Sequence, residues 1–160
     1  MSKLLCGAAI AALLCASSLS TASAEDAFYL GQYKITQVVK APWAKSDAEL
    51  VPEEMKSLVG QSITIKSDGI AGPGSFPCSD AVYQVMEGGP GMLFQGMFGQ
   101  MHDENQANDP QNLAEQVGFT GTQYWTVLTG CEFAVDFSFG TDKNTAMFAL
   151  NNAVYTLKRQ

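Results

Sequence analysis

The sequence predicts a mainly β domain in which an antiparallel meander of about eight strands closes into a small barrel and carries two short helices. Three observations support this prediction. Apolar and polar residues alternate over several short segments, most regularly at 132–139, where one parity holds Phe133, Val135, Phe137 and Phe139. Turn-forming Gly, Pro, Asp and Asn residues separate these segments. A meander of this size must hide its edges, and closure into a barrel does so, with a two-sheet β-sandwich as the alternative.

The first expected strand is rich in aromatic and β-branched residues and spans 28–39, with Tyr29, Tyr33, Ile35 and Val39 on one face. The glycine- and proline-rich segment at 72–77 is expected to be a loop. Further strands are expected at 61–66, 81–86, 92–98, 122–129, 132–139, 145–150 and 153–159. The last two of these are predicted to form a closing hairpin with a two-residue turn.

Two short helices are expected within the meander. Pro52 suits a first helical turn, which predicts a helix at 52–59. Asp109 is a good N-cap and precedes a proline, which predicts a second helix at 110–117. The polar segment 102–109 has the composition of an exposed loop.

The first 24 residues have the pattern of a secretory signal peptide. Lys3 supplies a positive start, Leu4–Leu14 is apolar, and Ala22-Ser23-Ala24 has the form that signal peptidase accepts. Removal of residues 1–24 would leave 25–160 as a single β-barrel domain. The protein is therefore expected in the periplasm or secreted, with no stable membrane insertion after cleavage.

The four cysteines divide between these two parts. Cys6 and Cys15 lie in the signal peptide, and Leu14 before Cys15 argues against a lipid anchor there. Cys78 and Cys131 remain, and in an oxidising compartment this pair is expected to form a disulfide. A thiol nucleophile or a metal ligand is the alternative for the pair.

The charge of the chain limits its partners. Residues 25–160 hold eight Lys and Arg and sixteen Asp and Glu, a net charge of −8. Such a protein is poorly suited to bind nucleic acid or an anionic membrane. It would attract a basic protein, although an acidic surface can also simply keep a secreted protein in solution.

Catalytic patterns are missing from the sequence, so the chain is expected not to be an enzyme. His102 is the single histidine, and no G-x-S-x-G surrounds a serine. Adjacent carboxylates such as Glu53 and Glu54 lie in polar surroundings that would not raise their pKa for acid catalysis. No phosphate loop, zinc spacing or calcium loop is present, and no cofactor is expected.

Two groups of residues are candidates for binding. Methionines accumulate before the histidine, and Met97, Met101 and His102 offer thioether and imidazole ligands that suit copper, especially Cu(I). Methionine also fills irregular space beneath a glycine-rich segment, which is the structural alternative. The second group would line a ligand cavity in the barrel, unless side chains fill the interior, and consists of Tyr33, Trp43, Tyr124 and Trp125.

The layout resembles the lipocalin-like group of small secreted barrels. Gly31-Gln32-Tyr33 in the first strand is similar to the lipocalin G-x-W, with Tyr33 in place of the tryptophan. Arg159 after the last strand resembles the basic residue that packs over that aromatic ring in lipocalins. The resemblance implies a barrel in which Arg159 covers Tyr33.

A second segment is similar to the S-G-x-x-Y motif of periplasmic inhibitors of C-type lysozyme, which are small disulfide-bonded barrels. The segment is Ser79-Asp80-Ala81-Val82-Tyr83, in which Asp80 replaces the glycine. This resemblance implies that Ser79 and Tyr83 belong to an inhibitor loop. As a whole, the chain looks like an exported bacterial protein.

Together these observations predict a non-enzymatic exported binding protein. Its partner would be a small apolar ligand inside the barrel or a basic protein on the surface. One alternative is an inhibitor of a basic hydrolase such as lysozyme, and another is a periplasmic copper-binding protein.

Overall fold

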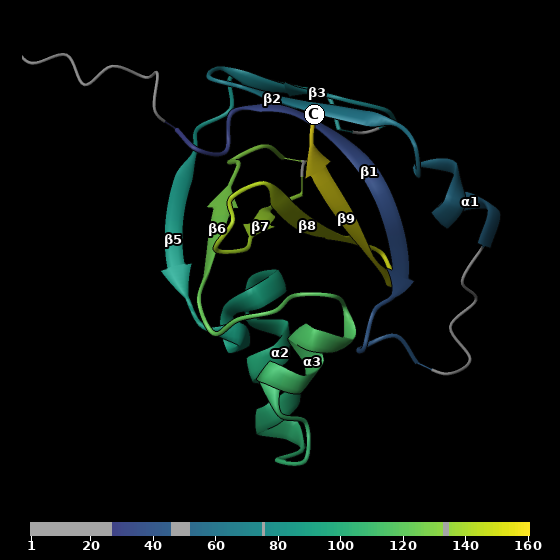
Figure 1. Cartoon of the computed structure of the whole chain (residues 1–160), viewed down its shortest axis with the longest axis vertical. Helices are drawn as coiled ribbons and strands as arrows, with labels where there is room; N and C mark the ends of the chain where they lie inside the picture. The colour runs from purple at the N-terminus through teal and green to yellow at the C-terminus, as the bar shows by residue number, and fades with distance from the viewer. Residues whose placement is uncertain (1–26, 46–51, 75, 133–134) are drawn as a thin grey trace, which may run out of the picture.

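The computed structural model describes residues 27–45, 52–74, 76–132 and 135–160, and it is mainly β (Figure 1). In this part of the chain, nine strands form one antiparallel sheet with the order β4-β3-β2-β1-β9-β8-β7-β6-β5. The sheet curls into a half-barrel (Figure 1). The predicted mainly β, barrel-like fold is therefore confirmed.

The strands are short and mostly joined in sequence. They are β1 Gly31–Lys40, β2 Ser62–Lys66, β3 Gly69–Ala71, β4 Cys78–Ser79, β5 Gln84–Gly88, β6 Tyr124–Leu128, β7 Phe137–Phe139, β8 Thr145–Leu150 and β9 Ala153–Arg159. The helices are α1 Pro52–Ser57, the 3-10 turn η2 Pro90–Met92, α2 Leu93–Glu104 and α3 Pro110–Gln116. None of these described helices is long and apolar enough to cross a membrane.

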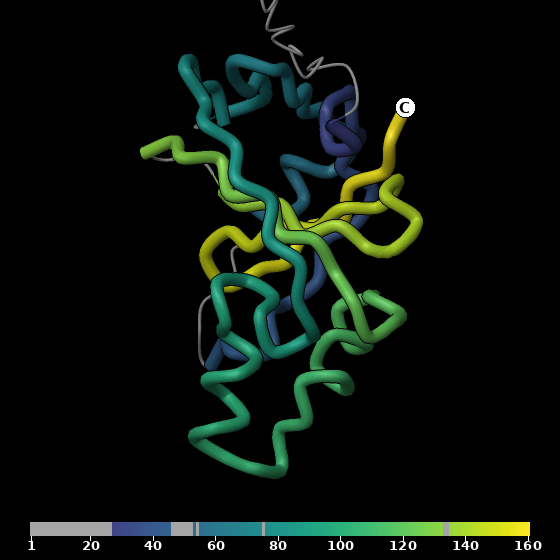
Figure 2. The backbone as a smooth tube through the Cα atoms, turned by 90° about the vertical axis from the view of Figure 1, so that its left-hand side faces the viewer, coloured from purple at the N-terminus to yellow at the C-terminus, as the bar shows by residue number. Residues whose placement is uncertain are grey.

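The sheet buries a different apolar set on each face. Strands from both ends of the strand order contribute to one cluster, which can only form on the concave side of the curl. This inner face is filled with side chains, among them Tyr33, Ile63, Val127, Phe137, Phe139, Phe148 and Leu157, all at most 1% exposed. On the outer face, α2 and α3 pack against residues such as Met147 and Val154. In Figures 1 and 2 both helices lie at one end of the molecule.

A register shift in β1 changes which side chains point inward. Tyr33 and Ile35 are buried on the inner face, but the pairing of β1 with β9 shifts between Ile35 and Gln37. Beyond the shift, Val38 packs on the inner cluster and Val39 on the outer one. The predicted common face is therefore wrong at Val39, because an extra residue in one strand reverses the alternation. It is also wrong at Tyr29, which precedes β1.

The segment predicted as a strand at 92–98 is instead η2 followed by the start of α2. A short apolar run does not distinguish a strand from a buried helix by periodicity alone. Phe98 and Met101 both pack on the outer cluster, a spacing that fits one side of a helix. Gly99 allows this helix to approach η2, because a Cβ there would lie 3.0 Å from the Gly91 carbonyl oxygen.

Most of the remaining elements match predicted ones with shifted ends, whereas the short strands β3 and β4 have no predicted counterpart. The helices predicted at 52–59 and 110–117 are α1 and α3, and Asp109 caps α3 by accepting a hydrogen bond from the Asn112 backbone N–H at 3.0 Å. The expected loop at 102–109 begins as the last turn of α2. The strand predicted at 132–139 is reduced to β7, and Phe133, like the predicted signal peptide at 1–24, lies outside the described residues.

Candidate functional site

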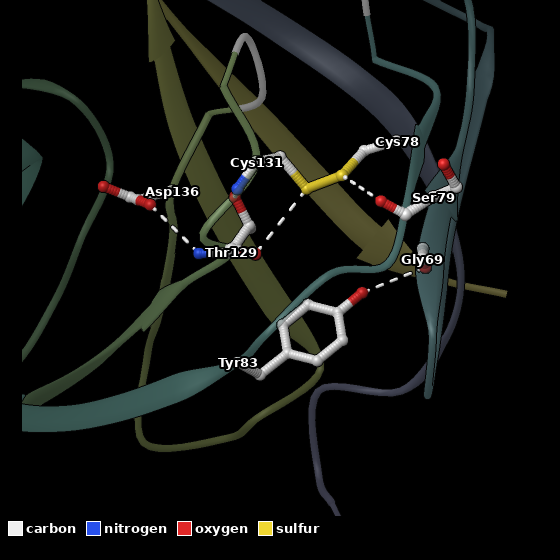
Figure 3. Close-up of a disulfide and its surroundings, with 7 residues drawn as sticks. All are labelled: Gly69, Cys78, Ser79, Tyr83, Thr129, Cys131 and Asp136. Atoms are coloured by element: carbon white, nitrogen blue, oxygen red, sulfur yellow. Dashed lines mark hydrogen bonds between the residues drawn. A yellow bond between two sulfur atoms is a disulfide. The ribbon is translucent and has the colours of Figure 1, made fainter.

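The predicted disulfide is confirmed. The sulfur atoms of Cys78 and Cys131 are bonded, with their Cα atoms 6.2 Å apart. Cys78 lies in β4 at one end of the strand order, and Cys131 follows β6 near the other end. The bond therefore links the two ends of the curled sheet (Figure 3).

Three hydrogen bonds reinforce the same junction. The Tyr83 hydroxyl donates to the Gly69 carbonyl at 2.9 Å, as Figure 3 shows. The backbone N–H of Val82 donates to the Thr129 carbonyl at 3.2 Å. The backbone N–H of Ala81 donates to the Asp68 carbonyl at 3.1 Å. Isolated hydrogen bonds, the disulfide and the backbone at 80–83, rather than a strand ladder, thus close this side of the half-barrel.

The segment Ser79–Tyr83 is held at this junction but remains open to solvent. Ser79 and Asp80 are exposed, and Val82 is 75% exposed. Asp80 has φ 61°, the left-handed conformation that glycine adopts most easily and that Asp tolerates better than most residues. Burial, together with the nearby Tyr29 and Asp68, raises the pKa of the Tyr83 hydroxyl to about 12.

One end of the barrel is covered by the residues that precede β1. The Arg159 guanidinium lies 4.8 Å from the centroid of the Tyr33 ring and donates to the Leu30 carbonyl at 2.7 Å, to the Phe28 carbonyl and to the Tyr33 hydroxyl. The Tyr33 hydroxyl in turn donates to the Tyr29 carbonyl at 2.9 Å. Burial raises the pKa of Tyr33 to about 12, against the opposing effect of Arg159.

The four aromatic residues predicted to line one cavity lie on two faces of the sheet. Tyr33 and Trp125 pack with the inner cluster, whereas Tyr124 and Trp43 pack with the outer cluster. The Tyr124 hydroxyl donates to the Gly121 carbonyl at 2.5 Å, and burial raises its pKa. Trp43 lines a hollow on the outer face. A ligand-binding role for these residues stays a prediction.

The three residues predicted as copper ligands lie in different surroundings. Met97 lines the same outer hollow as Trp43, and Met101 packs into the outer cluster. The Nδ1 atom of His102 is 3.0 Å from the Asn108 carbonyl oxygen. In the described ranges, no three or more His, Cys, Asp and Glu residues gather in an arrangement that could hold a metal ion.

Two adjacent hollows on the outer face form the candidate site, which we call the outer groove. Their volumes are about 270 and 330 Å³, and both are lined by Gln95 and Thr126. The first is also lined by Trp43, Phe94, Met97, Val135, Asp136, Ser138, Ala149 and Asn151. The second is also lined by Met86, Met92, Gly96 and Leu128. The floor is the sheet, since Thr126 pairs with Met86 of β5 and with Ser138 of β7.

The wall of the outer groove is an unusual turn at the start of α2. Phe94, Gln95 and Gly96 have φ values of 53°, 61° and 82°, so three consecutive residues are left-handed. Two of them are not glycine, and residues held in this region are a sign of strain that often marks functional sites. The Gln95 Nε2 atom donates to Oδ2 of Asp136 at 2.9 Å, which joins the turn to the sheet.

The Asp136 carboxylate is oriented from two sides. Its Oδ2 atom accepts the bond from Gln95, and its Oδ1 atom accepts one from the Thr129 backbone N–H at 3.3 Å (Figure 3). The Thr129 carbonyl also accepts the hydrogen bond from the Val82 backbone N–H at the junction described above. The carboxylate is thus fixed between the outer groove and the disulfide-linked segment.

Sequence reasoning missed Gln95, Thr126 and Asp136. The outward direction of Thr126 and Asp136 follows from alternation, because their neighbours Val127 and Phe137 point inward. The turn at 94–96 carries one local signal, Gly96, which supplies a residue suited to positive φ. No signal in the sequence places this turn against the sheet.

Comparison with known proteins yields no match to this chain among family models, curated proteins or solved structures.

Proposed function

We propose that this chain is a non-enzymatic exported binding protein that holds a small, largely apolar ligand in the outer groove rather than inside the barrel. The observation that carries the proposal is the contrast between the two faces of the sheet. The inner face is filled by large side chains, including Tyr33, Phe137 and Phe148 at 0% exposure. The outer face has two hollows that meet at Gln95 and Thr126.

The lining of the outer groove suits such a ligand. Small-molecule sites are concave and mostly apolar, and a few polar groups fix the orientation of the ligand. Met86, Met92 and Leu128 supply adaptable apolar surface in one hollow, since the unbranched methionine side chain fits irregular shapes. Gln95 and Asp136 supply polar groups in the other.

Export is supported by two features. The first 24 residues have the pattern of a signal peptide, and the Cys78–Cys131 disulfide fits an oxidising compartment. We place the protein in the periplasm or outside the cell on this basis.

Binding of the neutral fluorescent probe N-phenylnaphthylamine tests the proposed function. Thr126 lines both hollows, so the variant Thr126→Trp should fill the outer groove and weaken probe binding at least about tenfold, a loss of roughly 1.4 kcal/mol. Thr120→Trp adds the same side chain at an exposed position away from the outer groove and should bind as the unmodified protein does. Equal binding by all three proteins, or no binding by any, would contradict the proposal.

A second candidate is inhibition of a basic hydrolase such as C-type lysozyme through the segment Ser79–Tyr83. The left-handed backbone at Asp80 favours it, because the similar motif has glycine at this position. The disulfide and the Val82 hydrogen bond hold the segment in place, which lowers the entropy lost on binding.

The distribution of charge along the sequence also favours a basic partner. No Lys or Arg occurs between Lys66 and Lys143, whereas ten Asp and Glu do. A lysozyme activity assay tests this candidate, with the control Val59→Asp set against Val82→Asp because both change exposed valines. Val82→Asp alone should weaken inhibition, and the absence of inhibition at large molar excess would remove the candidate.

A further inference from the structure

The charge that lines the outer groove is negative. Among the described residues that line its two hollows, Asp136 is the only charged one. Most lining residues come from the stretch between Lys66 and Lys143, which contains no Lys or Arg. A ligand in the outer groove would therefore meet one carboxylate and no lining cation.

The Asp136 carboxylate is held in place by neutral groups. Its two donors are the Gln95 side-chain amide and the Thr129 backbone N–H, one to each oxygen. A carboxylate oxygen can accept more than one hydrogen bond, and neither donor neutralises the charge. The carboxylate thus remains able to attract a positive group.

Two aromatic rings line the same hollow as this carboxylate. Trp43 and Phe94 line the same hollow as Asp136, and their ring centroids are 5.5 Å apart. The face of an aromatic ring attracts a cation through its quadrupole, and tryptophan does so most strongly. The second hollow is apolar, with Met86, Met92 and Leu128 in its lining.

We infer that the outer groove selects an amphipathic organic cation. Its positive head group lies against Asp136 and the aromatic pair of Trp43 and Phe94, and its apolar chain continues past Gln95 and Thr126 into the methionine-lined hollow. This inference rests on the proposed function and adds the chemical class of the ligand.

Three probes with one octyl chain and different head groups test the inference by calorimetry on the disulfide-bonded protein. They are octyltrimethylammonium, octanol and octanoate. The cation should bind at least about tenfold more tightly than octanol, and octanoate should bind most weakly. Equal binding of all three probes would overturn the cation preference and leave the proposed function standing. No binding of any probe would overturn both.

A charge variant with a matched control separates the site from the general acidity of the protein. Asp136→Asn should reduce octyltrimethylammonium binding to the level of octanol and leave octanol binding unchanged. Asp103→Asn makes the same change in net charge on an exposed part of α2 and should have little effect. Equal losses in both variants would overturn the inference, because they would show attraction by the whole surface.

A second variant keeps the test valid if Asp136→Asn does not fold. Trp43→Leu retains an apolar side chain in the outer groove and removes the aromatic face. It should weaken the cation about tenfold more than octanol. An equal loss for both probes would overturn the cation–π contribution and with it the placement of the head group.

Discussion

Two tyrosines, Tyr33 and Tyr83, make the stability of this protein sensitive to alkaline pH. Tyr33 and Tyr83 each donate a hydrogen bond to a backbone carbonyl, and burial raises the pKa of both to about 12. In the unfolded chain a tyrosine has a pKa of about 10. Both groups therefore favour the folded state below pH 10, and this contribution is lost as the pH rises through 12.

Denaturant unfolding across this pH range measures the effect. The free energy of unfolding should fall between about pH 10 and pH 12, and the fall should be smaller in Tyr83→Phe, which keeps the ring and removes the ionisable group. An unchanged slope in this variant would show that Tyr83 does not contribute.

Phe137 provides a test of the inner core. Its side chain is 0% exposed, so Phe137→Ala should lower the free energy of unfolding by roughly 3–5 kcal/mol. Val59→Ala, at a valine that is 38% exposed, should change it by less than about 0.5 kcal/mol. Comparable losses in the two variants would mean that Phe137 is not a core residue.

The alternation of apolar and polar residues predicts the inner core around Phe137, but it does not predict the hydrogen bonds of the adjacent Asp136. Phe137 and Phe139 are buried on the predicted face, and Val135 packs against the same cluster. Asp136 points the other way, where alternation alone suggests a free surface carboxylate. The structure gives it two donors, one of them from the distant Gln95, and a contact across 41 positions leaves no pattern in the local sequence.

At the scale of elements, most strands are predictable because one buried face imposes a period of two. The short strands β3 and β4 are not, since Gly69–Ala71 and Cys78–Ser79 are too brief to show a period. The start of α2 is not predictable either, because its glycines permit several conformations and packing on the outer face selects among them. The outer groove depends on this packing.

The left-handed turn of α2 allows a test with two glycines. Gly96 has φ 82° and open space around its Cα, so Gly96→Ala should cost about 1 kcal/mol through backbone strain alone. Gly89 has φ −86°, and a Cβ there would make only an ordinary contact of 3.7 Å. Gly89→Ala should therefore be neutral or slightly stabilising. Thermal unfolding of both variants measures the difference in stability. Equal effects of the two substitutions would argue against a left-handed backbone at Gly96.

At the scale of the whole molecule, a disulfide joins the two ends of the sheet, which the backbone at 80–83 also connects. The Cys78–Cys131 disulfide spans 53 positions, and chain-entropy arguments give it roughly 4 kcal/mol of stability. The double variant Cys78→Ser/Cys131→Ser should lose about this amount in denaturant unfolding. Reductant should destabilise the unmodified protein and leave the double variant unchanged. Equal stability with and without the bond would mean that the hydrogen bonds at the junction suffice.

The inner face of the sheet is filled with side chains, whereas the outer face carries both the cluster under α2 and α3 and the two hollows of the outer groove. Photo-crosslinking with an octyltrimethylammonium probe that carries a diazirine in its chain shows where a ligand lies. Labels read by mass spectrometry should fall on outer-groove residues such as Met92, Met97 and Thr126. Labels on the inner-face residues Val127 and Phe148 would instead place the ligand inside the barrel and contradict a binding site on the outer face.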